Sequence, residues 1–396
     1  MTSCKNLLAI FFACALVHTP LAVGDEADVL NVNATLFTMR DNNLFRQAPS
    51  ANRQSEVINT MALGLNFNKL FGIQRIVANV NMVDNRYQTN NYLNFTALNY
   101  DAKWLWAIGQ RWTGDLVFER IEGLVPFTDY SNFRQRNVRT TENERFNANY
   151  WFHTEWAVVA GLSRTSQTNE QVFLADSDYN ATSYNYGLRY RPTSGNNITL
   201  RTVHQEGNYS KRQFNALAQY DNGFTQDNYG VDFDWRLTGK SQFRGRMDYL
   251  NRQHEHFADR NYAGMVGNLD YIYAYSGKGS MTLGYKRGLE SFQQVTSSYY
   301  TLDEFNLAAQ WAATAQITAA ARAGYGVRSY KGEIAPLPSG VQQREDKFTR
   351  AGLDLAYQPS RWLQLKAGVS MENRNVNYDT LDYKDRIAFL SATAQY

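Results

Sequence analysis

Residues 227–247 constrain the fold more than any other stretch, because their side chains alternate between two chemistries. The apolar row consists of Tyr229, Val231, Phe233, Trp235 and Leu237, and the polar row of Asn228, Gly230, Asp232, Asp234 and Arg236. Since successive side chains of a strand point to opposite faces, this run predicts a strand with one apolar and one charged face. A turn at Thr238-Gly239-Lys240 follows, and the next run repeats the pattern.

Each face of this predicted hairpin needs its own surroundings. Two or more charges on one strand face need water, and a ring-rich row needs an apolar medium outside. A transmembrane β-barrel with a water-filled lumen meets both needs. A strand of a soluble sandwich also alternates, so one hairpin does not separate the two folds.

The rest of the chain repeats the same alternation in about eighteen strands, an even number, as single-chain bacterial barrels have. Short turns are expected at residues 69–72, 107–111, 153–155, 192–195, 238–240, 276–279, 313–314 and 358–360, with a long polar loop between each pair of them. Outer-membrane barrels have short periplasmic turns and long outer loops. The sequence therefore predicts an all-β, transmembrane, antiparallel up-and-down barrel with both termini in the periplasm.

Composition excludes two other classes. A mean hydropathy of -0.52 rules out a bundle of membrane-spanning helices. A formal net charge of +3 over 396 residues is too balanced for a nucleic-acid binder. The 14% aromatic content suits the ring girdles of a barrel at the membrane interfaces.

The N-terminus predicts export. Lys5, an apolar run over residues 7–17 and small residues before Asp25 have the order of a signal peptide, which we expect to span residues 1–24. A retained membrane helix would need a longer apolar run, and a lipid-modified Cys14 would leave apolar residues on the mature chain. Residues 25–396 contain no cysteine, and with no break in composition we expect one barrel domain there.

The alternation also predicts which side chains line the lumen. The charged members of this set are Lys103, Asp115, Arg145, Arg189, Arg201, Asp232, Asp234, Arg236, Arg244, Arg246, Asp248, Lys286, Arg322, Arg350 and Lys366. Both signs are mixed, so the wall would be hydrated and able to bind hydroxyls and carboxylates. The simpler interpretation for any single residue is that it pairs across the wall and stabilises the barrel.

Aromatic side chains facing inward or on loops are candidates for stacking on sugar rings. They are Trp151, Tyr209, Phe214, Tyr220, Phe224 and Trp362. The alternative, weighed equally, is that these rings pack the loops against each other or lie near lipid headgroups.

Catalytic and metal-binding signals are weak. His254-Glu255-His256 places two histidines on one predicted loop, without a third ligand nearby in sequence. A solvated loop explains these residues better. No Gly-x-Ser-x-Gly, His-Glu-x-x-His or phosphate-binding loop is present in the sequence. We therefore expect no enzyme, no metal and no cofactor.

Several stretches resemble a known family. They are Asp41-Asn42-Asn43-Leu44-Phe45-Arg46, Arg212-Gln213-Phe214-Asn215, residues 221–229, Leu237-Thr238-Gly239-Lys240-Ser241 and residues 357–365. In this order and spacing the chain is similar to EpsL, the outer-membrane barrel encoded with exosortase-linked exopolysaccharide systems. The C-terminal Tyr396 stands where phenylalanine is commoner.

The resemblance implies a channel that exports an extracellular polysaccharide across the outer membrane. The implied partners are the polysaccharide, outer-membrane lipid, and periplasmic and inner-membrane proteins of polysaccharide synthesis and export. Two alternatives remain open. A diffusion porin for small solutes would be favoured by a long loop folded into the lumen, for which residues 122–140 or 205–226 are long enough. An outer-membrane enzyme would depend on His254 and His256.

Overall fold

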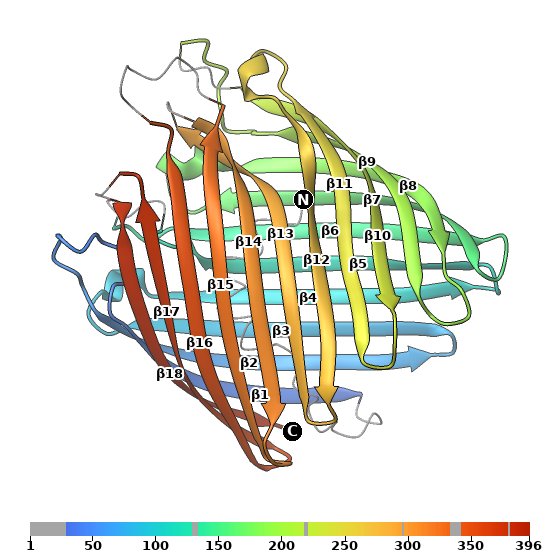
Figure 1. Cartoon of the computed structure of the whole chain (residues 1–396), viewed down its shortest axis with the longest axis horizontal. Coiled ribbons are helices and arrows are strands. Elements are labelled where there is room, and N and C mark those ends of the chain that lie inside the picture. Colours follow the sequence, from blue (N-terminus) through green and yellow to red (C-terminus); the bar gives the residue numbers. More distant parts are fainter. Residues whose placement is uncertain (1–28, 129–133, 218–220, 295–296, 333–341, 379–380) are drawn as a thin grey trace.

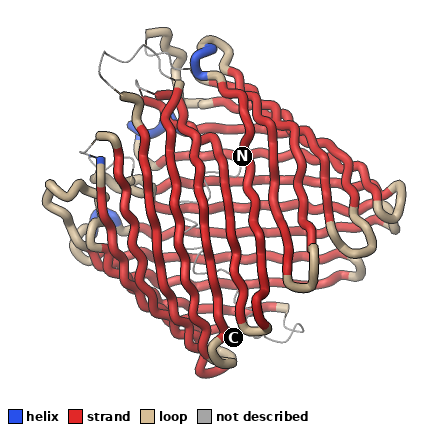
Figure 2. The backbone as a smooth tube through the Cα atoms, viewed as in Figure 1, coloured by secondary structure: helices blue, strands red, loops and turns tan. Residues whose placement is uncertain are grey.

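The computed structural model describes residues 29–128, 134–217, 221–294, 297–332, 342–378 and 381–396, which form one closed sheet of eighteen antiparallel strands (Figures 1 and 2). The strands are β1 Leu30–Asp41, β2 Glu56–Phe71, β3 Gln74–Tyr87, β4 Phe95–Ile108, β5 Trp112–Leu124, β6 Val138–Trp151, β7 Trp156–Asn169, β8 Tyr179–Tyr190, β9 Asn197–Asn208, β10 Gly223–Arg236, β11 Ser241–Gln253, β12 Tyr262–Ser276, β13 Gly279–Gln294, β14 Ser297–Ala312, β15 Ile317–Lys331, β16 Glu345–Ser360, β17 Leu363–Val376 and β18 Tyr383–Gln395. Each strand pairs with the next along the chain. The sheet closes where β1 meets β18, in a register from Asn33 opposite Gln395 to Asp41 opposite Ile387.

The alternation that predicts the strands also sets their orientation. Leu36, Phe305 and Leu353 are 61%, 58% and 60% exposed and belong to the apolar rows, which therefore face outward. The strands have 12 to 16 residues, more than the roughly 9–11 that cross a bilayer. The outer face is thus apolar and the inner face polar, which confirms the predicted eighteen-stranded barrel.

The connections differ between the two ends of the barrel. Eight short connections lie at one end, here called the short-turn end, where β1 also begins and β18 ends. The opposite, long-loop end includes the short 3-10 helices η1 Asn91–Leu93, η2 Val172–Ser177 and η3 Ala258–Arg260. None of the helices in the described ranges is long and apolar enough to cross a membrane. That the short-turn end faces the periplasm stays a prediction.

One expected loop is absent from the long-loop end. The strict alternation of short and long connections is wrong at β13 and β14, because only residues 295–296 separate them. The polar residues that suggested a loop continue the ladder instead, with Arg287 opposite Asp303 and their side chains 3.2 Å apart. The expected signal peptide, residues 1–24, lies outside the described residues.

Candidate functional site: the barrel lumen

Charged side chains of opposite sign meet on the inner faces of β9, β10 and β11. The Arg201 guanidinium on β9 is 2.7 Å from the Asp232 carboxylate and 2.9 Å from the Asp248 carboxylate. Arg246 lies 2.6 Å from the other oxygen of Asp232. The register brings these residues together, because Gly230 of β10 lies between Arg201 and Asp248 and its missing side chain leaves them room. The charges of this wall are thus paired with each other.

Residues that lie opposite each other on paired strands also form rows of side chains, and these rows follow the sheet around the barrel. One row contains Asp234, Arg244, Asp270, Gly284, Asn306, Gly324, Arg350, Glu372 and Asp385. It begins beside a short turn, at Asp234, and ends near the long loops, at Asp385, because the strands of a barrel are staggered. Arg244 is 3.2 Å from Asp234, so opposite charges alternate at the start of the row.

A second group of ion pairs lies on β14 to β17. Arg350 contacts Glu304 at 2.9 Å and Glu372 at 2.6 Å. Asp354 pairs with Arg322 and lies 3.9 Å from Lys366. These contacts support the simpler interpretation of the predicted lumen charges, namely that many of them stabilise the wall by pairing.

The wall from β4 to β8 is less ionic. Arg145 lies 3.4 Å from Asp115, which also accepts a hydrogen bond from Asn147. Arg189 donates to the neutral oxygens of Asn149 and Thr199, at 2.9 and 3.1 Å.

Besides Arg189, three predicted lumen cations have no carboxylate within ion-pair distance in the part of the chain that the structure describes. They are Lys103, Arg236 and Lys286. Register places all three on the inner face, in the same alternating rows as Asp101, Asp234 and Gly284. Their charge is available to a solute in the lumen.

The aromatic candidates divide into buried and exposed rings. Trp151, Tyr209 and Phe224 are 9%, 5% and 4% exposed, and guanidinium groups cover their rings. The covering groups are those of Arg191, Arg212 and Arg252, respectively. Stacking on a sugar requires a free ring face, so the structure does not support that role for these three residues.

The other aromatic candidates lie at different ends. Phe214 stays half exposed at the long-loop end, where it stacks on Phe257 with ring centroids 5.8 Å apart. Trp362 is exposed in a short turn at the opposite end. Tyr220 lies outside the described residues. The five described rings therefore do not form one sugar-binding surface.

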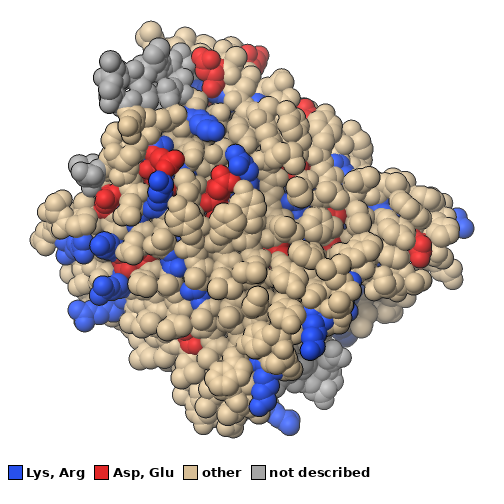
Figure 3. Space-filling model, viewed as in Figure 1, with Lys and Arg blue, Asp and Glu red and all other residues tan. Residues whose placement is uncertain are grey.

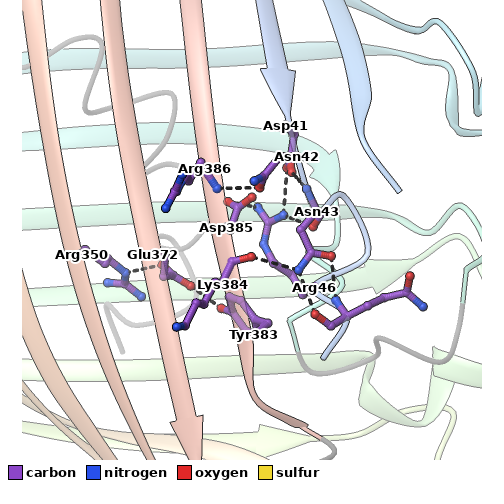
Figure 4. A network of polar contacts seen from close by, with 11 residues as sticks. Asp41, Asn42, Asn43, Arg46, Arg350, Glu372, Tyr383, Lys384, Asp385 and Arg386 are labelled. Atoms are coloured by element: carbon purple, nitrogen blue, oxygen red, sulfur yellow. Dashed lines mark hydrogen bonds and ion pairs between the residues drawn. The ribbon is translucent and has the colours of Figure 1, made fainter. Parts of the chain in front are cut away.

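A polar network joins the first and last strands at the long-loop end (Figure 4). Arg46, in the loop after β1, lies 2.8 Å from Asp41 and 3.1 Å from Asp385. Its backbone φ of 53° is in the left-handed region, which is uncommon for a residue with a side chain. Asn43 ties the same loop to β18 by donating to the carbonyl of Lys384 at 3.1 Å. The sequence marked this stretch as a family resemblance but gave no sign that it closes the barrel.

An apolar cluster lies beside this network. Leu44 and Phe45 from the first loop pack with Leu93 and Phe127 from later loops and with inward Ile58, all nearly fully buried. The rings of Phe45 and Phe127 meet edge to face, with centroids 4.8 Å apart. Three loops therefore converge on the inner side of the barrel mouth.

One hydrogen bond shows how far the loop after β5 reaches. The Arg374 guanidinium on β17 donates to the carbonyl of Thr128 at 2.6 Å. Around the wall, β18, β1, β2, β3 and β4 lie between β17 and β5. Arg374 is itself held by Asp346, and both side chains are buried. Residues 125–128, which follow β5, thus reach across the mouth, over the inner faces of these five strands.

A separate group of loops covers β8 to β12. Arg212 donates to the carbonyls of Asp176 and Asp221, at 2.6 and 3.1 Å, while Lys211 lies 2.8 Å from Asp178. His256 contacts Asp221 at 3.1 Å. These contacts fix residues 170–178, the described residues 209–217 and 221–222, and residues 254–261 to each other.

The two histidines of the candidate metal pair have different surroundings. Burial lowers the pKa of His254 to about 4, so its ring is neutral at neutral pH. The ring of His256 instead binds Asp221. No cluster of three or more His, Cys, Asp or Glu side chains suited to a metal ion occurs within the described ranges.

Comparison with known proteins gives a consistent fold. The family described as "Putative beta-barrel porin 2" matches residues 249–396, and no curated protein matches. The structure of Pseudomonas aeruginosa OpdK with vanillate has a TM-score of 0.52 at 11% identity, covering 93% of this chain and 99% of that chain.

Two further solved structures are similar. A BenF-like porin from Pseudomonas fluorescens Pf-5 has a TM-score of 0.54 at 10% identity, covering 93% of this chain and 99% of that chain. Pseudomonas aeruginosa OccK2 (OpdF) in complex with glucuronate has a TM-score of 0.51 at 12% identity, covering 92% of this chain and 97% of that chain. At these identities the likeness concerns architecture. The chain has the fold of the outer-membrane porins, a closed barrel of eighteen antiparallel strands.

Proposed function

We propose that this protein is an outer-membrane channel through which small polar solutes diffuse, and that the first part of the loop after β5, residues 125–128, limits their size. The observation that carries this proposal is the fixed loop itself, with Phe127 in the apolar cluster and Thr128 bound to Arg374. A loop held across the mouth narrows the path. That suits a small solute better than a growing polymer, which needs an uninterrupted bore.

The lumen chemistry agrees with this role. Lys103, Arg236 and Lys286 offer positive charge without a carboxylate partner among the described residues, and inward amide groups such as that of Asn81 offer hydrogen bonds to hydroxyls. The relatives solved with vanillate and with glucuronate hold small carboxylates, which such a wall can also bind. Because positive and negative side chains alternate along the wall, a solute meets many weak binding sites and no strong one. Transport under this proposal is passive.

The direct test is liposome swelling with mono-, di- and tetrasaccharides. Phe127→Ser removes the apolar anchor of the loop, so entry of the larger sugars should rise relative to entry of the monosaccharide. Phe214→Ser, in the other group of loops, is the matched control and should leave this ratio unchanged. If freeing the loop, verified by faster proteolysis within residues 125–137, changes no swelling rate, the loop does not set the size limit.

Export of an extracellular polysaccharide is the second candidate, favoured by the five stretches that resemble EpsL. Under this proposal the partners would be the polymer and the periplasmic and inner-membrane proteins that make and deliver it. A gene-deletion strain separates the candidates. Polymer trapped in the periplasm supports export, whereas normal polymer with altered solute uptake supports diffusion. Replacing Arg236, Arg244 and Arg246 by Ala should then change polymer secretion only if the polymer uses this lumen.

A further inference from the structure

The short-turn end carries an unusual set of exposed cations. They are Lys69, Arg111, Arg191, Lys240, Lys278 and Arg361, here called the basic rim. Six of the eight short connections contribute one each, in the connection itself or within three residues of it. Across all eight connections, at residues 72–73, 109–111, 152–155, 191–196, 237–240, 277–278, 313–316 and 361–362, Glu155 is the one acidic side chain. The rim is therefore strongly positive.

No rim cation is within ion-pair distance of a carboxylate among the residues that the structure places. The long-loop end differs, because several of its cations are paired with carboxylates. Lys211 lies 2.8 Å from Asp178, and Arg344 lies 2.9 Å from Asp346. In Figure 3, basic side chains stand without acidic neighbours along the lower edge, whereas both signs mix toward the top. Arg191 lies over the Trp151 ring and Lys69 over the Phe71 ring, but no carboxylate of the described residues neutralises either charge. The positive charge of the rim thus remains available to something outside the chain.

The surroundings of the rim indicate what that is. Trp112, Trp311 and Trp362 are 46%, 52% and 58% exposed at the same end, in or near short connections. The Arg111 guanidinium donates to the Tyr150 hydroxyl at 3.5 Å. Exposed tryptophans of a barrel lie at the level of the lipid headgroups. The cations beside them therefore lie at that level too, which favours lipid over a protein partner.

We infer that the basic rim binds the headgroups of anionic phospholipids, such as phosphatidylglycerol, in the leaflet at the short-turn end. Lysine and arginine side chains at a membrane surface are attracted to anionic lipid within a Debye length. The rim would anchor this end of the barrel in a phospholipid leaflet. This inference depends on the fold and the rim and not on what passes through the lumen.

The test measures which lipid lies next to the barrel. The protein is reconstituted in vesicles of equal phosphatidylcholine and phosphatidylglycerol, with bromine on the acyl chains of one lipid at a time. Bromine quenches nearby tryptophans, so brominated phosphatidylglycerol should quench at least about twofold more strongly than brominated phosphatidylcholine. Raising salt from about 0.1 M to about 1 M shortens the Debye length from about 10 Å to about 3 Å and should remove the difference.

Two variants assign the effect to the rim. In the first, all six rim cations become Gln, and the preference for phosphatidylglycerol should disappear. In the matched control, six cations toward the long-loop end become Gln, which removes the same net charge and should leave the preference intact. These control residues are Arg86, Arg164, Lys331, Lys347, Lys384 and Arg386.

Equal quenching by both lipids in the unaltered protein would overturn the inference, and so would a preference lost in the control but kept in the rim variant. If the rim variant does not fold, quenching of the unaltered protein at low and high salt still tests the inference, because a preference that high salt does not remove would contradict it. Liposome swelling should be the same in the rim variant as in the unaltered protein, so failure here and failure of the proposed channel remain distinguishable.

Discussion

Two parts of the inner wall follow the same alternation but have different chemistry. On β1 to β4, the middle of the wall is mostly amide, with Asn33, Asn66, Asn79, Asn81 and Asn99 facing inward. On β9 to β11 it is ionic, with Arg201, Asp232, Arg246 and Asp248 in mutual contact. Both walls are polar enough for water. The ionic wall is also cross-linked by its own charges, so the comparison predicts that it carries more of the barrel's stability.

The largest difference is expected for Arg201→Ala. It leaves buried Asp248 and its neighbour Asp232 without their shared partner, which should cost about 3–5 kcal/mol of the free energy of unfolding. Asn81→Ala on the amide wall should cost less than about 1 kcal/mol. Denaturant unfolding in detergent measures both. Equal losses would show that the ionic wall is no more cross-linked than the amide wall.

The glycines of the two walls sharpen the same comparison. A methyl group on Gly230 would lie 2.4 Å from the backbone carbonyl of Met247 and also meet the Asp248 carboxylate. One on Gly64 would meet only the amide ends of Asn33 and Asn81, which can rotate into the lumen. We expect Gly230→Ala to destabilise by about 1–3 kcal/mol and Gly64→Ala by less than half of that, in the same unfolding measurement. A larger loss of stability in Gly64→Ala than in Gly230→Ala would mean that the ionic wall accommodates an added methyl group more easily than its contacts indicate.

The loops above the two walls should differ in their response to pH. Burial lowers the pKa of His254 to about 4 from an unfolded value of 6.5, so the ordered loops bind fewer protons than the disordered ones between these values. Their stability is complete above the unfolded pKa and falls as pH drops toward the folded one, by up to about 2 kcal/mol at about pH 5.

Limited proteolysis at about pH 5 and about pH 7.5 measures this effect. Cleavage within residues 209–222 should become faster at the lower pH, and His254→Gln should remove the change. Residues 88–94, above the amide wall, contain no histidine and should show no such response. A response of the same size in all the loops would point to a cause other than His254.

The smallest expected effect is on ion selectivity. Arg244 and Arg246 changed to Gln remove two positive charges from the ionic wall and should shift the reversal potential in a salt gradient toward cation selectivity. The matched variant changes Asn66 and Asn81 of the amide wall to Gln. It alters no charge and should leave the reversal potential unchanged. No shift in the arginine variant would mean that the ion path avoids this wall.

The fold could be predicted from sequence because alternation is a local property of each strand. The pairings could not, because they depend on the register between strands. Arg201 reaches Asp248 across 47 residues of sequence, and Arg350 reaches Glu304 across 46. The loop across the mouth was one of two candidates by length, but its contact spans 246 residues, and the nearby sequence does not encode it.

The join between β1 and β18 differs from every other pairing of the described strands, because its two strands are far apart in the sequence. One edge of β1 pairs with β2, the next strand of the chain, but its other edge is completed only by β18, where Tyr396 pairs with Val32 through two backbone hydrogen bonds. Until then, β1 is left with an unpaired edge that another chain could occupy. Arg46, which links Asp41 to Asp385, can form its two contacts only after that encounter, so it locks the finished ring and does not guide the earlier hairpins.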